Sequence, residues 1–217
     1  MTYKVEICKS PGWRNHKACV LGVSTPSPNW RGEKFAAILG FAAANSNELH
    51  IDVTDALYAH NFMADGAAPD EAHRMAMNLG DQWLTENMLM IDACPLRPKI
   101  VRWSAWYNHP GYDAALMGFR LRYADNSLLR EMIEADVDQF FVRRDIQPTM
   151  RQRAHARDFI LEEMAVLSLQ GSQMPAVRLY PGNQLNSMRV LRQGLIPGVP
   201  EGLEKQQFAC VRCIPSA

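Results

Sequence analysis

The sequence lacks the long apolar run, the charge excess and the cysteine pattern that mark several large classes of protein. No stretch approaches the roughly 20 apolar residues of a membrane-spanning helix, and the N-terminal MTYKVEIC lacks the apolar core of a signal peptide. The 23 basic and 23 acidic residues give a formal net charge of zero, whereas nucleic-acid-binding proteins usually carry a basic excess. We therefore expect a cytoplasmic protein that contacts no membrane and contacts any nucleic acid through a local basic patch.

Cysteine is sparse, and its five positions do not have the spacing of a disulfide framework. Cys210 and Cys213 form a C-x-x-C pair, but no second pair or nearby histidine completes a zinc site. In a strand, two residues three positions apart also point to opposite faces. The six histidines show no metal-ligand spacing either. The sequence therefore predicts reduced cysteines, no metal and no cofactor.

Several catalytic motifs are also missing. There is no G-x-x-x-x-G-K-[ST] phosphate loop, no G-x-G-x-x-G after a strand and no H-E-x-x-H. The G-x-S-x-G nucleophile elbow is absent around Ser24, since Pro26 stands where its second glycine would be. A serine hydrolase or another serine acyltransferase stays open as an alternative, but a hydrolase needs a histidine base near Ser24.

What is present is an alternation of strand and helix patterns along 217 residues, 47% of them hydrophobic. This alternation predicts an α/β fold with a mainly parallel sheet flanked by helices, in a single domain over residues 1–217. We expect strands at Tyr3–Cys8, Ala18–Val23, Glu48–Asp55, Lys99–Ala105, Val177–Tyr180 and Phe208–Cys213, and a loop at Lys9–Lys17. We expect helices at Gly32–Ala44, Pro69–Met90, Gly111–Tyr123, Ser127–Arg144 and Pro148–Leu169.

Chemistry-bearing side chains follow several of these strands. Ser24 directly follows the apolar run at Ala18–Val23, and Tyr180 ends a later strand before Pro181. Ligands of parallel sheets bind beyond the carboxyl ends of the strands. We therefore expect Ser24, Asp55, the loop after Trp103 and the loop after Tyr180 along one edge.

Two further residues are candidates for catalysis. Phe159 and Glu163 are four apart in a predicted helix and share a face, so Glu163 can bind an ammonium group, whereas Glu162 falls elsewhere on the helix. Tyr180, at a strand end, can donate or relay a proton. The alternatives stay open: a surface glutamate above a core phenylalanine, and a tyrosine that only packs.

In order and approximate spacing, these pieces resemble one family, the cyclodipeptide synthases, over roughly residues 17 to 215. Gly22-Val23-Ser24 resembles the G-[IV]-S signature of that family, and Phe159–Glu163 resembles its Y-x-x-x-E motif. Tyr180-Pro181 resembles the "YP" of the subfamily called XYP, with Ser27 at the X position. The other matching pieces are Phe62–Gly66 and Tyr112.

This resemblance implies a Rossmann-like fold similar to the catalytic domain of class I tyrosyl- and tryptophanyl-tRNA synthetases. It implies that Ser24 takes the first aminoacyl group from its tRNA, that Glu163 holds the α-ammonium and that Tyr180 relays protons. Tyr112 helps to position the aminoacyl group. The implied substrates are two aminoacyl-tRNAs, and the product is a cyclic dipeptide. Neither metal nor ATP is implied, and we expect the enzyme to be a monomer.

The family implies a substrate pocket with Gly22, Ser27, Trp103, Phe159, Arg178 and Pro181 in its walls. Arg178 lies two residues before Tyr180 and points the same way in a strand. We hypothesise that Arg178 lets the pocket accept an acidic or polar side chain. Phe159 departs from the family, since it replaces the usual tyrosine.

The long helix expected at Pro69–Met90 is nearly devoid of Lys and Arg, whereas many relatives carry a basic helix there. The best candidates for a tRNA contact therefore lie elsewhere. They form two groups: Arg97, Lys99 and Arg102, or Arg143, Arg144, Arg151, Arg153 and Arg157. A non-catalytic binding module of synthetase-like fold is the remaining alternative, and it would leave Ser24 unacylated.

Overall fold

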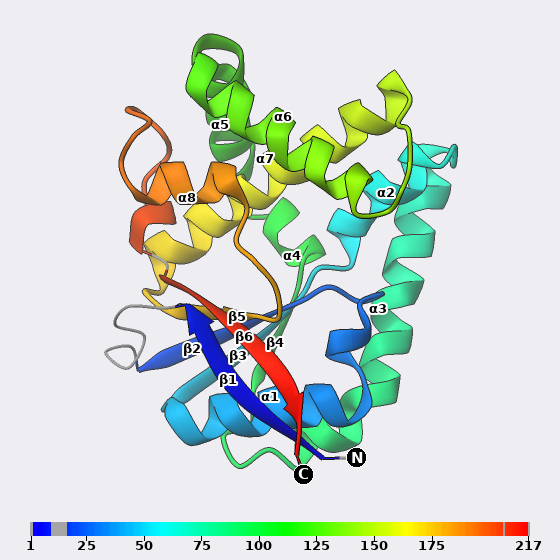
Figure 1. Cartoon of the computed structure of the whole chain (residues 1–217), viewed down its shortest axis with the longest axis vertical. Helices are drawn as coiled ribbons and strands as arrows, with labels where there is room; N and C mark the ends of the chain where they lie inside the picture. Colours follow the sequence, from blue (N-terminus) through cyan, green and yellow to red (C-terminus); the bar gives the residue numbers. More distant parts are fainter. Residues whose placement is uncertain (1, 10–16, 206, 217) are drawn as a thin grey trace.

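A computed structural model describes residues 2–9, 17–205 and 207–216, and these residues form a six-stranded sheet (Figure 1). The order across the sheet is β1-β6-β5-β2-β3-β4, in which β1 is antiparallel to β6 and all other neighbours are parallel. The strands are β1 (Tyr3–Lys9), β2 (Ala18–Val23), β3 (Glu48–Val53), β4 (Lys99–Arg102), β5 (Val177–Tyr180) and β6 (Gln207–Pro215).

Helices cover both faces of this sheet. In Figure 1, α1 lies below the sheet and α5, α6, α7 and α8 lie above it. The α-helices are α1 (Gly32–Asn45), α2 (Ala59–Ala64), α3 (Pro69–Asp92), α4 (Ser104–Tyr107), α5 (Tyr112–Asp125), α6 (Ser127–Val142), α7 (Met150–Gln173) and α8 (Asn186–Arg192). Short 3-10 helices occupy Pro28–Trp30, Ala56–Tyr58 and Leu203–Lys205.

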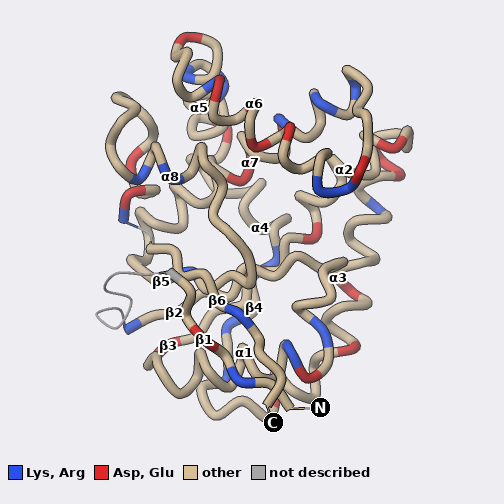
Figure 2. The backbone as a smooth tube through the Cα atoms, viewed as in Figure 1, with Lys and Arg blue, Asp and Glu red and all other residues tan. Residues whose placement is uncertain are grey.

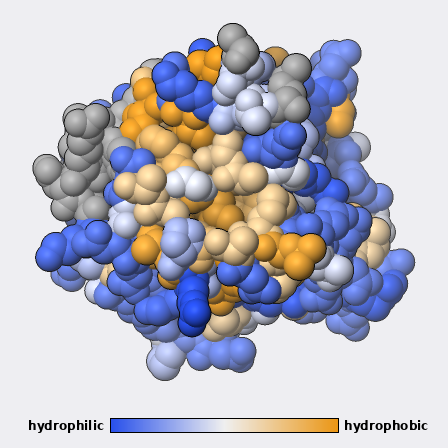
Figure 3. All heavy atoms as spheres, turned by 90° about the horizontal axis from the view of Figure 1, so that it is seen from below, coloured by the Kyte–Doolittle hydropathy of each residue, from blue (hydrophilic) through white to orange (hydrophobic). Residues whose placement is uncertain are grey.

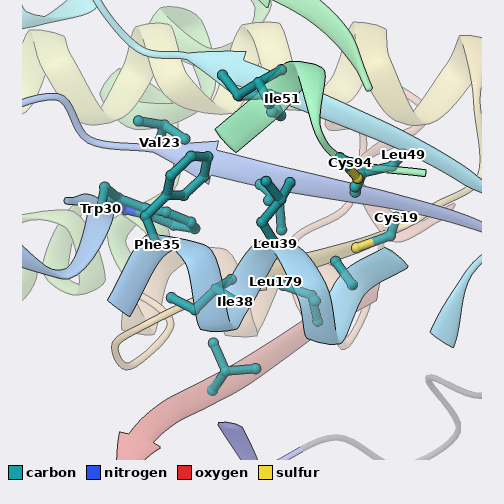
Figure 4. Packing of buried hydrophobic residues seen from close by; sticks show 14 of the residues in the cluster. Cys19, Val23, Trp30, Phe35, Ile38, Leu39, Leu49, Ile51, Cys94 and Leu179 are labelled. Atoms are coloured by element: carbon teal, nitrogen blue, oxygen red, sulfur yellow. The ribbon is translucent and has the colours of Figure 1, made fainter. Parts of the chain in front are cut away.

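The central strand β2 is buried along its whole length because the sheet is covered on both faces. On the lower face, Cys19 and Val23 pack in one core with Phe35, Ile38 and Leu39 of α1 (Figure 4). Burial of each large apolar side chain contributes roughly 1.5–3 kcal/mol. This core fixes the direction in which β2 ends, and therefore the position of the residue that follows it.

A second core joins the helices above the sheet. Phe119 of α5, Ile133 of α6, Met164 of α7 and Leu191 of α8 are buried together in it. The helix α7 begins with a capping box in which the Thr149 side chain and Gln152 satisfy each other's backbone N–H groups. The upper layer is thus held by its own core, which leaves room for a cavity between it and the sheet.

The predicted α/β fold and its Rossmann-like character are confirmed, but two strands were predicted too long at their carboxyl ends. The strand predicted at Lys99–Ala105 ends at Arg102, and Ser104 begins α4. The strand predicted at Glu48–Asp55 ends at Val53, because the Asp55 side chain caps the next 3-10 helix by accepting from the Ala56 N–H. The helices α2, α4 and α8 were not predicted at all. The predicted loop at Lys9–Lys17 falls on residues 10–16, outside the described residues.

Charges of both signs are mixed along α6 and α7 in Figure 2, as the zero net charge suggests. On the face seen from below, hydrophobic and neutral residues gather at the centre and hydrophilic ones surround them (Figure 3). Within the described residues, none of the helices is both long and apolar enough to cross a membrane.

Candidate functional site

A cavity of about 580 Å³ lies between the sheet and the helices α6, α7 and α8. It opens where β2 and β5 end, as expected for a ligand site at the carboxyl edge of a parallel sheet. Eight of the residues predicted for the site line it: Gly22, Ser24, Ser27, Phe159, Glu163, Arg178, Tyr180 and Pro181. The structure thus brings together residues that are as far apart in the sequence as Gly22 and Pro181.

Ser24 is half-buried in the turn that follows β2. Its carbonyl accepts from the Ser27 N–H at 3.0 Å, and the Ser27 hydroxyl accepts from the Asn29 N–H at 3.4 Å. On the strand side, both the N–H and the hydroxyl of Thr54 donate to the Val23 carbonyl, at 3.0 and 2.7 Å. The backbone of Ser24 is therefore held from both sides, while its side chain faces the cavity.

The carboxyl group of Glu163 reaches the same cavity from α7. No hydrogen bond to it comes from any of the described residues. Burial raises the pKa of Glu163, and the positive charges of Arg178 and Arg192 offset part of that rise. An unengaged carboxylate in a confined cavity is a ready acceptor for an ammonium group, because the ammonium supplies both charge and hydrogen bonds.

Tyr180 ends β5, and its ring packs between Trp30 and Phe208, with centroid distances of 6.3 and 6.2 Å. Burial, reinforced by the negative charge of Glu163, raises the pKa of Tyr180 to about 12. The phenol therefore stays protonated at neutral pH and acts as a hydrogen-bond donor. The Asn29 amide donates to the Pro181 carbonyl at 3.5 Å, which ties the Ser24 turn to the Tyr180 turn.

Arg178 lines the cavity on the side of the sheet, which we call the floor, and its side chain extends across a neighbouring strand. It starts on β5, crosses β2 and donates to Asp52 on β3 at 2.5 Å and to Gln170 of α7 at 2.6 Å. A Cβ at Gly22 would clash with the Nη1 atom of Arg178, so this crossing requires glycine. The pair modifies the prediction for Arg178, because Asp52 already balances its charge.

Histidine is absent from the described residues that line this cavity. Nor do three or more His, Cys, Asp or Glu side chains gather in a metal-binding arrangement anywhere in the described part of the chain. Among the described residues that line the cavity, Ser24 therefore has no imidazole to act as a general base.

A family model described as cyclodipeptide synthase matches residues 5–170. The chain belongs to the cyclodipeptide synthase family. The family consists of tRNA-dependent aminoacyltransferases, so the chain is an enzyme of that class. No curated protein sequence matches it significantly.

Solved structures share the fold of this synthase. A cyclodipeptide synthase from Fluoribacter dumoffii has a TM-score of 0.86 and 23% identity, with 98% of both chains covered. A Mycobacterium tuberculosis protein, described as relating cyclodipeptide synthetases to type I tRNA synthetases, has a TM-score of 0.74 and 17% identity over 92% of this chain and 87% of that one. A synthase from Candidatus Glomeribacter gigasporarum bound to Phe-tRNAPhe has a TM-score of 0.68 and 19% identity, over 92% and 88% of the two chains.

Two residues predicted to contact substrate, Trp103 and Tyr112, are absent from the cavity lining. Both contact Glu162, the neighbour of Glu163: the Trp103 Nε1–H donates to it at 2.9 Å, and Tyr112 also hydrogen-bonds to it. The Tyr107 hydroxyl donates at 2.8 Å, and the His60 Nε2 lies 3.0 Å away. Burial acts to raise the pKa of Glu162, but these hydrogen bonds lower it overall.

Glu162 is therefore the centre of a buried polar cluster that the sequence did not reveal. The expectation that it falls elsewhere on α7 than Glu163 holds. The signal for its burial would have been the tryptophan and tyrosine at residues 103 and 107, which lie within and just after the strand predicted at Lys99–Ala105. Because α7 is covered on most of its circumference, adjacent glutamates reach two different environments.

The predicted basic groups separate into paired and unpaired residues. Lys99 and Arg102 bind the acidic residues Glu48, Asp55 and Asp81. Arg153 and Arg157 both bind Glu134 of α6. In contrast, Arg143 and Arg144 line the cavity and bind no carboxylate of the described residues. The sequence also gave no sign of Arg192, the last residue of α8, which lines the cavity as well.

Proposed function

We propose that this synthase, as a single domain, joins two aminoacyl groups from aminoacyl-tRNAs into a cyclic dipeptide, a 2,5-diketopiperazine, through an acyl-enzyme on Ser24. The observation that carries the proposal is the meeting of Ser24, Glu163 and Tyr180 in one cavity at the carboxyl edge of the sheet. The three residues come from a loop, a helix and a strand that are far apart in the sequence and meet only in the folded chain.

In the first step, the Ser24 hydroxyl oxygen attacks the ester carbonyl of an aminoacyl-tRNA. The new bond joins Ser24 to the aminoacyl group, and the tRNA leaves with its ribose oxygen protonated by the proton that Ser24 loses. An ester on tRNA is already activated, so the attack needs no strong base. Glu163 pairs with the α-ammonium, and the protonated Tyr180 donates a hydrogen bond and passes protons on.

In the second step, the amine of the acyl-enzyme attacks the ester of a second aminoacyl-tRNA. A peptide bond forms, the second tRNA leaves with its ribose oxygen protonated by the proton that the attacking amine loses, and a dipeptide stays on Ser24. The free amine of this dipeptide then attacks its own ester to Ser24. This closes the six-membered ring and returns the proton to the serine oxygen. No oxidant, metal or nucleotide enters the balance.

For the tRNA contact, Arg143 and Arg144 are the candidates that line the cavity without a carboxylate partner. Guanidinium groups at the mouth of an acylation site suit the phosphates near the acylated end of a tRNA. The bound Phe-tRNAPhe of the Glomeribacter synthase supports this type of partner. We place the protein in the XYP subfamily on Ser27, Tyr180 and Pro181, and propose that it acts as a monomer in the cytoplasm, where aminoacyl-tRNAs are made.

The test is capture of the acyl-enzyme. Purified protein is mixed with one aminoacyl-tRNA and examined by mass spectrometry for the mass of the aminoacyl group on Ser24. Ser24→Ala should lose both the adduct and the cyclic dipeptide. The matched control is Ser127→Ala at an exposed position of α6, which should keep both. Release of free amino acid without cyclic dipeptide would indicate a hydrolase, and an unacylated Ser24 would indicate a binding module.

A further inference from the structure

Arginine side chains outnumber carboxylates among the described residues that line the cavity. Among the described lining residues, the charged ones are Asp136, Arg143, Arg144, Glu163, Arg178 and Arg192. The carboxylate of Asp136 is already engaged, because the N–H groups of Asn186 and Ser187 at the start of α8 donate to it at 2.9 and 2.8 Å. This leaves Glu163 as the carboxylate that is free to meet a ligand.

The two arginines deepest in the fold are not equivalent. Arg178 is ion-paired with Asp52 and hydrogen-bonded to Gln170. Arg192 has no carboxylate and no hydrogen-bond acceptor among the described residues, and its Nε and Nη1 atoms are buried without a partner. Its guanidinium group lies 5.7 Å from the ring centroid of Phe208, which is the cross-strand neighbour of Arg178.

A buried cation without an acceptor is unfavourable, since a partner-free polar group loses its hydration and gains nothing in return. Burial, together with the charge of Arg178, lowers the pKa of Arg192 to about 10, while Glu163 acts in the opposite direction. Glu163 is therefore the main charge that compensates Arg192 in the free enzyme.

Substrate binding removes that compensation. An aminoacyl group on tRNA carries an α-ammonium but no α-carboxylate, because the carboxyl carbon is the ester. Once Glu163 pairs with the ammonium, Arg192 faces an added positive charge and no anion. A neutral side chain leaves this imbalance in place, whereas a side-chain carboxylate removes it.

We propose that Arg192 binds the side-chain carboxylate of an aspartyl or glutamyl group, so that one residue of the cyclic dipeptide is acidic. This rests on the proposed function, since it names the substrate class of the same cavity. Arg178 acts behind Arg192, because its ion pair with Asp52 and its hydrogen bond to Gln170 fix the floor of the cavity. Arg192 is thus the specificity-determining residue, and Arg178 is a positioning residue.

The experiment compares the wild type, Arg192→Gln, Arg192→Lys and Arg189→Gln in purified form. Each is given aspartyl-, glutamyl- and a set of neutral aminoacyl-tRNAs, singly and in pairs, and Ser24 acylation and cyclic dipeptides are measured. Arg189 is exposed on the same helix, one turn before Arg192, and does not line the cavity, so Arg189→Gln is the matched control.

We expect wild-type products that contain Asp or Glu. Arg192→Gln should lower the rate with the acidic aminoacyl-tRNA by about tenfold or more relative to neutral ones, as expected for loss of a charge-assisted hydrogen bond. Arg192→Lys should keep part of the preference, because the charge stays while the planar fork is lost. Arg189→Gln should match the wild type. Thermal unfolding of Arg192→Gln should be unchanged or raised, since the lost cation has no partner.

Three results would overturn the inference, and they differ in what they leave standing. Products with neutral residues alone would remove it and keep the proposed function. An equal loss with every aminoacyl-tRNA would assign Arg192 to a tRNA phosphate. Absence of Ser24 acylation by any aminoacyl-tRNA would remove both the inference and the proposed function.

Discussion

Two adjacent glutamates of α7 occupy opposite kinds of environment. Glu162 is 7% exposed and its carboxylate accepts from the Trp103 indole and the Tyr107 hydroxyl, with His60 beside it. Glu163 borders the cavity and accepts no hydrogen bond from the described residues. Buried polar groups are normally satisfied by the protein itself. The difference therefore separates a carboxylate that holds the fold together from one that is left for a ligand.

The largest expected effect comes from Glu163→Leu. Loss of the carboxylate that pairs with the α-ammonium should lower kcat/KM by about 100-fold or more, as for one partner of a confined ion pair. The free energy of unfolding should change little, because burial makes the ionised Glu163 unfavourable in the folded protein, whereas its charge compensates that of Arg192. Kinetics with a fixed pair of aminoacyl-tRNAs and thermal unfolding measure the two quantities. A stable and fully active Glu163→Leu variant would contradict the assignment of Glu163 to substrate binding.

The same substitution one residue earlier should do the reverse. Glu162→Leu leaves the Trp103 and Tyr107 donors without an acceptor, so the free energy of unfolding should fall by about 3 kcal/mol. Urea unfolding followed by tryptophan fluorescence measures this. The fraction that stays folded should keep Ser24 acylation within about threefold of the wild type, since Glu162 touches no cavity residue of the reaction. A large loss of acylation in folded protein would mean that the cluster does more than hold α7.

The pH profile sharpens the contrast further. Glu163 must be ionised to bind an ammonium, and burial raises its pKa. On the acid side, kcat/KM should therefore fall at a pH above the value of about 4.3 that an exposed glutamate would give. Tyr180, with a pKa of about 12, should add no limb near neutral pH. Rates of acylation between mildly acidic and neutral pH test this. Glu163→Gln should flatten the acid limb, and a limb that persists in Glu163→Gln would belong to another group.

The smallest effect is expected from Phe159→Tyr, which offers Glu163 a hydroxyl donor of the kind that Glu162 already has. Phe159 lines the cavity one helical turn before Glu163. A donated hydrogen bond lowers the pKa of a carboxyl group, so the acid limb should move to lower pH. The rate near neutral pH should change by no more than about tenfold, because the added hydroxyl donates one hydrogen bond and the carboxylate keeps its charge. Phe119→Tyr is not a suitable control, because Phe119 is buried in the helical core. The control is Ser127→Ala, at an exposed position of α6.

The sequence contained enough to predict the sheet and most of the cavity. The buried run that forms β2 and the turn residues after it placed Ser24, and the helical spacing of Phe159 and Glu163 placed the carboxylate. It could not place Trp103 and Tyr112, because helical spacing says which residues share a face but not which neighbouring element that face meets. Both turned out to face Glu162 rather than Glu163.

Arg192 could not be predicted for a related reason. It belongs to no motif, and α8, the seven-residue helix that carries it, was itself not predicted. Arg192 stands out because no hydrogen-bond acceptor among the described residues reaches its Nε and Nη1 atoms, and only the packed structure shows this. Arg178, in contrast, was visible from the strand alternation before Tyr180, but its partner Asp52 is 126 residues away.

The crossing of Arg178 over Gly22 makes the two positions epistatic. Any residue larger than glycine at position 22 collides with the guanidinium group, and any shorter residue at position 178 leaves Asp52 buried without its cation. A change in the shape of this floor during evolution therefore requires substitutions at positions 22, 52 and 178 together. Relatives with a different substrate preference should therefore differ at these three positions together.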